Sequence, residues 1–137
     1  DPFNLRNPRR DSALISLAGP LANLTLAILS SLILRLIPIL SFGALSPIGM
    51  LLSMIIILNV NLAIFNLIPI YPFDGFHVVQ GFLSEQAARQ WAQLESLGYI
   101  MILVLVFPLF GSSPVLSFIR PIITFLTSLL VPAVSVI

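Results

Sequence analysis

The sequence contains no cysteine, and its 137 residues include a single histidine and only 8% charged residues. Without cysteine there are no disulfides and no thiolate metal ligands, so a transition metal would have to be held by histidine or carboxylate side chains. The net charge of +1 is too small to indicate a nucleic-acid partner, and we expect none.

Hydrophobic residues make up 58% of the chain, and the mean hydropathy is +1.12. Soluble domains carry roughly 25% charged residues, so this composition indicates an integral membrane protein. The length allows about four spans of ~20 residues with short loops. We therefore predict an all-α fold, a polytopic membrane helix bundle of about four transmembrane helices plus one interfacial helix. Residues 1–137 would form a single transmembrane domain.

Four apolar segments are the expected spans, and a polar segment between the second and third is the expected interfacial helix. The spans cover about residues 13–34, 49–67, 97–110 and 115–130, and the interfacial helix lies within 84–97. Ser84 suits the N-cap of that helix, and Trp91 and Tyr99 suit aromatic anchors at the membrane surface. Arg35 at the end of the first span and Arg120 within the last span are expected to extend to the interfaces. For Arg120 the alternative is an ion pair within the bundle.

The distribution of arginine predicts the orientation of these spans. Arg6, Arg9 and Arg10 precede the first span, and short arginine-rich loops stay on the cytoplasmic side. The second span then returns the chain to the cytoplasmic side, where Asp74 would lie. We expect a multi-pass protein of the cell membrane with Asp74 near its cytoplasmic face.

Small and polar residues recur at helical spacing in the first two spans. In lipid such residues favour close helix packing and hydrogen bonds between helices. In the second span, Asn59 and Asn66 lie seven residues apart and share a face, and Asn61 points elsewhere. Packing is the interpretation favoured for Asn59 and Asn61. In the first span the small stripe consists of Ser12, Ser16, Gly19, Asn23, Ala27 and Ser30.

The second span is interrupted at its end by the sequence NLIPIYPFDG, residues 66–75. Pro69 and Pro72 each remove an amide donor and disfavour helix in the residue before them, so the helix should end near Leu67. The residues that follow should be irregular and extended, and could pair with an extended peptide. Gly75 is expected to be a turn residue, since glycine is able to take positive φ.

Asp74 is the acid at this break. An ionised carboxylate in or near a bilayer is costly unless it is paired, hydrated or bound to a metal, which makes Asp74 the first candidate for function. His77 follows three residues later and lies close enough to suggest a metal pair. A lone histidine near an interface is more often a hydrogen-bonded surface residue, and that interpretation is favoured here.

The break resembles the N-x-x-P-x-P-x-L-D-G signature of the site-2 protease family of intramembrane zinc metalloproteases. Asn66, Pro69, Asp74 and Gly75 match, Phe73 replaces leucine, and the family's usual adjacent prolines are reduced to Pro72. The sequence GPLAN at 19–23 resembles the G-P-x-x-N element of the same family. The resemblance implies that Asp74 is the third protein ligand of a catalytic Zn²⁺. It also implies that Asn66 has a catalytic role, holding the substrate backbone or stabilising developing oxyanion charge.

A hydrolytic zinc site needs three protein ligands, a position for water and a general base. In the family an H-E-x-x-H motif on an earlier membrane helix supplies the rest, and this sequence contains no such motif. We therefore expect a C-terminal part of a zinc metalloendopeptidase, incomplete and inactive alone. Its partners would be missing N-terminal helices with H-E-x-x-H, membrane lipid and a transmembrane protein substrate. The alternative is a non-catalytic degenerate homologue, or a transporter-like protein in which Asp74 binds a proton or cation.

Overall fold

The computed structural model describes residues 7–36, 46–106 and 113–132, and all regular structure in these ranges is helical. The predicted all-α class is confirmed for this part of the chain. The elements are α1 (Pro8–Leu36), α2 (Pro47–Asn66), α3 (Asp74–Phe82), α4 (Glu85–Ala92), the 3-10 helix η2 (Gln93–Leu97), α5 (Gly98–Val106) and α6 (Pro114–Leu130).

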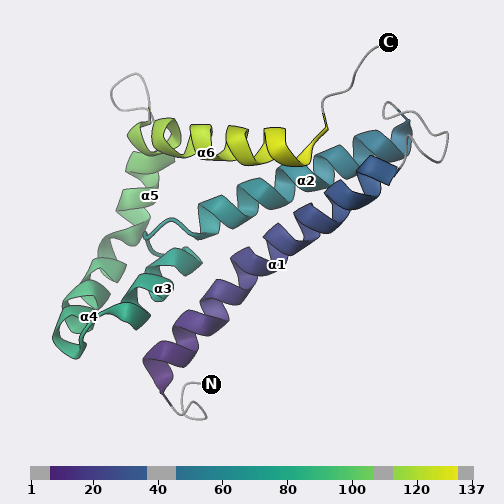
Figure 1. Cartoon of the computed structure of the whole chain (residues 1–137). Coiled ribbons are helices and arrows are strands. Elements are labelled where there is room, and N and C mark those ends of the chain that lie inside the picture. The colour runs from purple at the N-terminus through teal and green to yellow at the C-terminus, as the bar shows by residue number, and fades with distance from the viewer. Residues whose placement is uncertain (1–6, 37–45, 107–112, 133–137) are drawn as a thin grey trace.

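Helices α1 and α2 lie side by side and run in opposite directions (Figure 1). α1 extends a few residues beyond the predicted span at each end and contains Pro20 in its interior. α2 begins where Ser46 accepts a hydrogen bond from the Gly49 amide at 3.1 Å. Pro47 occupies the first turn. Amides in the first turn have no acceptor within the helix, so the missing amide proton of proline costs no helical hydrogen bond there. Capping and proline chemistry therefore define the start of α2.

The apolar core lies where α6 crosses the α1–α2 pair (Figure 1). Its fully enclosed members are all aliphatic, and one of them is alanine, whose small side chain allows the helices to approach closely. They are Ala27, Leu34, Ile56 and Val60, with Ile123, Leu126 and Leu130 packed around them.

Two hydrogen bonds from α1 secure the last turn of α6. Ser31 donates its hydroxyl proton to the Leu130 carbonyl, and Arg35 Nη2 donates to the Leu129 carbonyl at 2.8 Å. Carbonyls in the last turn of a helix lack helical partners, and a cation there also suits the helix dipole. Arg35, expected simply to extend to an interface, thus joins two helices.

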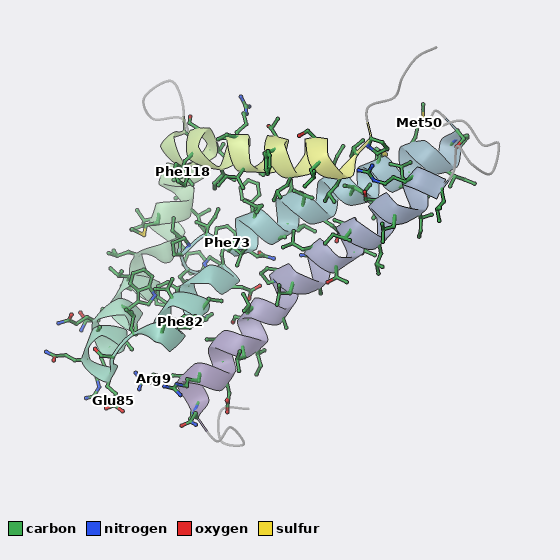
Figure 2. The ribbon with its side chains drawn as sticks, in the orientation of Figure 1. Arg9, Met50, Phe73, Phe82, Glu85 and Phe118 are labelled. Atoms are coloured by element: carbon green, nitrogen blue, oxygen red, sulfur yellow. The ribbon has the colours of Figure 1, made fainter. Side chains whose placement is uncertain are left out.

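Helix α3 lies against the N-terminal half of α1, and α4 follows it (Figure 1). Arg9 of α1 donates to the Leu83 carbonyl at 3.4 Å and lies 3.5 Å from a Glu85 carboxylate oxygen. Figure 2 places Arg9, Glu85 and Phe82 at one end of the molecule and Met50 at the other. These exposed polar contacts hold the entry of α4 near the start of α1.

The predicted helix after Ser84 is confirmed, and so is its cap. The Ser84 hydroxyl accepts a hydrogen bond from the Ala87 amide at 3.4 Å. Within α4, Arg89 and Glu85 form an exposed ion pair at 3.6 Å. Exposed pairs of this kind contribute only tenths of a kcal/mol, about 0.3–0.5, and this pair lies within α4, so it does not fix the position of the helix.

Two of the predicted spans are long and apolar enough to cross a membrane, α1 and α2. α6 is a shorter apolar helix, and α5 is described only over Gly98–Val106. The structure therefore supports two membrane-spanning helices, and the larger span count stays a prediction. The predicted outer turn at 39–47 lies almost wholly outside the described residues, as do Arg6 and the last residues of the third predicted span.

Candidate functional site

The site is built around the break between α2 and α3. α2 ends at Asn66, and the Leu67 amide closes its last turn by donating to the Ala63 and Ile64 carbonyls, each at 3.2 Å. Pro69 follows shortly after and cannot continue the helix. The prediction that the second span stops near Leu67 is confirmed.

The irregular segment 67–73 folds into compact turns, so the expectation of an extended strand is wrong. The Ile68 amide donates to Phe65, the Ile70 amide to Ile68 at 2.8 Å, and the Phe73 amide to Ile70 at 2.9 Å. The Tyr71–Pro72 peptide bond is cis. Most backbone amides of the segment therefore donate to carbonyls within the segment or at the end of α2, and its two prolines have no amide proton.

Asp74 is the first residue of α3, and Phe73 is the N-cap. A carboxylate in the first turn is favoured by the positive end of the helix dipole. The side chain is directed at α1: its Oδ2 atom lies 3.1 Å from the position that a Cβ would occupy on Gly19. The two sequence motifs, far apart in the chain, therefore meet at this carboxylate.

Gly75 allows two segments of main chain to approach closely, and the expectation that it is a turn residue is wrong. It lies in the first turn of α3 and is buried. A Cβ on Gly75 would overlap the Leu67 carbonyl group and would lie 2.6 Å from the Ile68 carbonyl oxygen. α3 thus begins pressed against the end of α2, which places Asp74 beside the last turn of that helix.

Asn66 is the last residue of α2 and is half-buried. No hydrogen bond joins its amide to the residues described here. The two other asparagines of α2 behave differently, because Asn59 donates to the Ile55 carbonyl at 2.8 Å and Asn61 to the Ile57 carbonyl at 2.7 Å. Both bonds stay within α2, so among these three amides Asn66 is the one available to a ligand.

His77 lies on α3 among aromatic rings. Its ring meets Tyr71 edge-on at 6.3 Å between centroids and Phe76 at 5.6 Å. No group of three or more His, Asp or Glu side chains comes together within the described residues. Asp74 therefore does not belong to any cluster of three such side chains in the described part of the chain.

An aromatic cluster joins the break to α4 and α5. Trp91 stacks on Phe76 with centroids 5.3 Å apart and donates its indole proton to the Phe76 carbonyl at 3.1 Å. Tyr71 meets Tyr99 edge-on at 6.0 Å. The pKa of Tyr71 is raised above its usual value, chiefly by the nearby Tyr99 phenol and then by burial and the Glu95 carboxylate. Trp91 thus connects α4 to the start of α3, and Tyr71 connects the break to α5.

One groove in the described residues lies apart from Asp74. It has a volume of about 720 Å³ and lies between the start of α1 and the outer end of α3. Arg9, Arg10 and Glu85 stand beside it, and its floor is apolar: Ala13, Leu14, Leu17, Val78 and Phe82. The candidate site is therefore a carboxylate on a helix surface beside α1, separate from this groove.

Comparison with known proteins identifies the family. The profile of peptidase family M50 matches residues 37–109, which include α2, the break and α3. The chain belongs to peptidase family M50. This is the site-2 protease family, so the resemblance seen in residues 66–75 is confirmed.

A curated relative agrees with this membership. The Bacillus subtilis (strain 168) protein named "Putative zinc metalloprotease YwhC" is 33% identical over 118 residues, covering 81% of this chain and 54% of the relative. The chain thus spans about half the length of that M50 relative. No solved structure matches.

Proposed function

We propose that this chain contributes Asp74 as the third protein ligand of the catalytic zinc of an intramembrane metalloendopeptidase. Membership of family M50 supports the peptidase class. The observation that carries the residue assignment is the meeting of Asp74 with Gly19, which brings the carboxylate of one family motif onto the helix of the other.

A catalytic zinc takes three protein ligands, usually histidine and carboxylate, with one position open. Asp74 fits one of these places, since it is half-buried and makes no ion pair or hydrogen bond with the described residues. The sequence holds one histidine and no H-E-x-x-H. We propose that the two other ligands and the general base belong to a part of the protein outside this sequence, so that the chain is incomplete alone.

Zinc, when bound, would act as a Lewis acid on the scissile carbonyl and make water a better nucleophile. Asp74 would hold the metal at the start of α3, where the helix dipole favours its negative charge. Asn66 would donate a hydrogen bond from its free amide to the peptide oxygen on which charge develops. The prolines and Gly75 bring these two residues to adjoining helix ends.

The substrate would be a membrane-spanning protein segment unwound near the cut. The turns at 67–73 leave few backbone donors for a strand to pair with, because Ile68, Ile70 and Phe73 bond internally. We therefore place the substrate backbone beside Asn66 and Asp74, and do not propose strand pairing along the whole segment.

The protein would be a multi-pass protein of the cell membrane. α1 and α2 meet the length and hydropathy of spans. Arg9 and Arg10 at the start of α1 and Arg89 on α4 would lie on the cytoplasmic side, which short arginine-rich segments prefer. Asp74 would then lie toward that side, at the end of α2.

The test uses the full-length protein, purified in detergent. Zinc per chain and cleavage of a model transmembrane substrate are measured for wild type, Asp74→Asn and Asp11→Asn. Asp11 provides the matched control, since it accepts a hydrogen bond from the Asn7 amide at the start of α1. We expect Asp74→Asn to lose bound zinc and to lower cleavage by more than about 100-fold, and Asp11→Asn to behave as wild type. Membrane insertion should be unchanged in both.

Two outcomes contradict the proposal. Zinc-dependent turnover retained in Asp74→Asn removes Asp74 from the reaction. A full-length protein that binds no zinc and cleaves nothing supports the degenerate or transporter-like alternative, in which Asp74 binds a proton or another cation.

A further inference from the structure

Position 19 is unusual because it holds glycine inside a long helix. Gly19 lies in the interior of α1, and glycine is the poorest helix former after proline. A glycine at such a position leaves room for another group to approach the helix closely. The role of this glycine therefore depends on which group lies next to Gly19.

That group is the Asp74 carboxylate. A Cβ added at Gly19 would lie 3.1 Å from Asp74 Oδ2 and 4.0 Å from its Cγ, and it would meet no other neighbouring group of the described residues within 4 Å. Gly81 offers a contrast, because a Cβ there would overlap Ala13 and approach the Arg9 carbonyl at 3.2 Å. Gly81 therefore serves the packing of α3 on α1, whereas the space at Gly19 is used by one carboxylate.

We propose that Gly19 is a positioning residue for the Asp74 carboxylate: its missing side chain lets Oδ2 lie against α1 in the orientation that the metal requires. This inference rests on the proposed function, in which Asp74 is a zinc ligand. It assigns a specific task to the glycine of the GPLAN sequence.

The close packing of the α3 main chain means that a side chain at position 19 would move the Asp74 carboxylate rather than the helix. Gly75 approaches the Leu67 carbonyl and Gly81 approaches Ala13 so closely that the main chain of α3 is tightly packed at both of its ends. A methyl group at position 19 would therefore push the carboxylate itself by a few tenths of an ångström. Metal–ligand distances tolerate about ±0.2 Å, so a shift of this size should weaken zinc binding.

Gly19→Ala should consequently affect folding and metal binding in opposite directions. Alanine is the better helix former, and the one close neighbour is a side chain that can rotate. The metal-free protein should be as stable as wild type or more stable, while zinc binds less tightly. A glycine needed only for packing would show lower stability and normal zinc affinity per folded chain.

The experiment compares full-length wild type, Gly19→Ala and Ala18→Gly in detergent. Ala18 is the exposed neighbour of Gly19 on α1 and serves as the control. Three quantities are measured: zinc affinity by competition with a chelator, the visible absorption spectrum of the Co²⁺-loaded protein, and the Tm of the metal-free protein. For Gly19→Ala we expect zinc affinity to fall about 10–100-fold, a changed Co²⁺ spectrum, and an equal or higher Tm. Ala18→Gly should lower the Tm and leave zinc affinity unchanged.

A double-mutant cycle separates the two roles of the glycine without using metal. If Gly19→Ala changes the Tm more favourably in an Asp74→Ala background than with Asp74 present, the added methyl group meets the carboxylate, as proposed. An equal change of Tm in both backgrounds shows no contact with the carboxylate and overturns the inference. Wild-type zinc affinity and an unchanged Co²⁺ spectrum in Gly19→Ala also overturn it, and leave the role of Asp74 intact. A wild-type protein without Asp74-dependent zinc overturns both proposals.

Discussion

The indole N–H of Trp91 donates a hydrogen bond to the main-chain carbonyl of Phe76 at 3.1 Å, while the two rings stack. Phe76 is nearly fully buried at 2% exposure, and it lies in the first turn of α3 with Asp74. A residue expected to anchor the protein at the membrane surface thus makes direct contacts with the helix that carries the candidate ligand.

Trp91→Phe should preserve the stacking and remove the hydrogen bond. We expect a loss of about 1 kcal/mol in the free energy of unfolding, the usual net value of one such bond. Unfolding by SDS in mixed micelles, followed by far-UV circular dichroism, measures it. Phe82→Leu is the control, because Phe82 is 84% exposed. If Trp91→Phe is no less stable than this control, the indole hydrogen bond does not support α3.

Gly75→Ala should be strongly destabilising. The added methyl group would overlap the Leu67 carbonyl group, which is main chain and cannot rotate away. Overpacking of this kind costs about 1–3 kcal/mol. The Tm of the metal-free protein tests this, with Gly19→Ala as the matched glycine-to-alanine change. Equal Tm values for the two variants would show that α3 is not wedged against the end of α2.

Asn66→Ala should impair cleavage and spare stability. Its amide makes no hydrogen bond to the described residues, so little folding energy is lost. Removing one donor to a developing oxyanion lowers kcat about 100-fold or more. The measurements are kcat on a model transmembrane substrate and the Tm of the full-length variant. Asn59→Ala is the control, since the Asn59 amide already bonds to Ile55 within α2. Equal losses of kcat in the two variants would remove Asn66 from the site.

Some of the expectations drawn from the sequence depend on local chemistry, and these agree with the structure. Pro69 ends α2 because proline has no amide proton and clashes with the preceding turn. Ser84 caps α4 because its hydroxyl can accept from a free amide of the first turn. The motif around Asp74 likewise led to the family that the M50 match confirms.

Other expectations failed because the conformation depends on tertiary contacts, which local sequence rules do not describe. Gly75 was expected to be a turn residue, and instead it lies in α3, where its missing side chain makes room for the Leu67 carbonyl at the end of α2. Residues 68–73 were expected to extend, and instead their amides close turns. In both cases the way α3 packs on the end of α2 decided the conformation.

The sequence by itself determined that the chain is helical and strongly apolar, where its second long helix ends, and which family it belongs to, because composition, proline and a short motif act locally. Only the tertiary structure decided that the carboxylate of Asp74 rests against Gly19, that Arg35 closes the end of α6, and that Trp91 packs on Phe76. These relationships join residues far apart in the chain, and the packing of helices sets their distances.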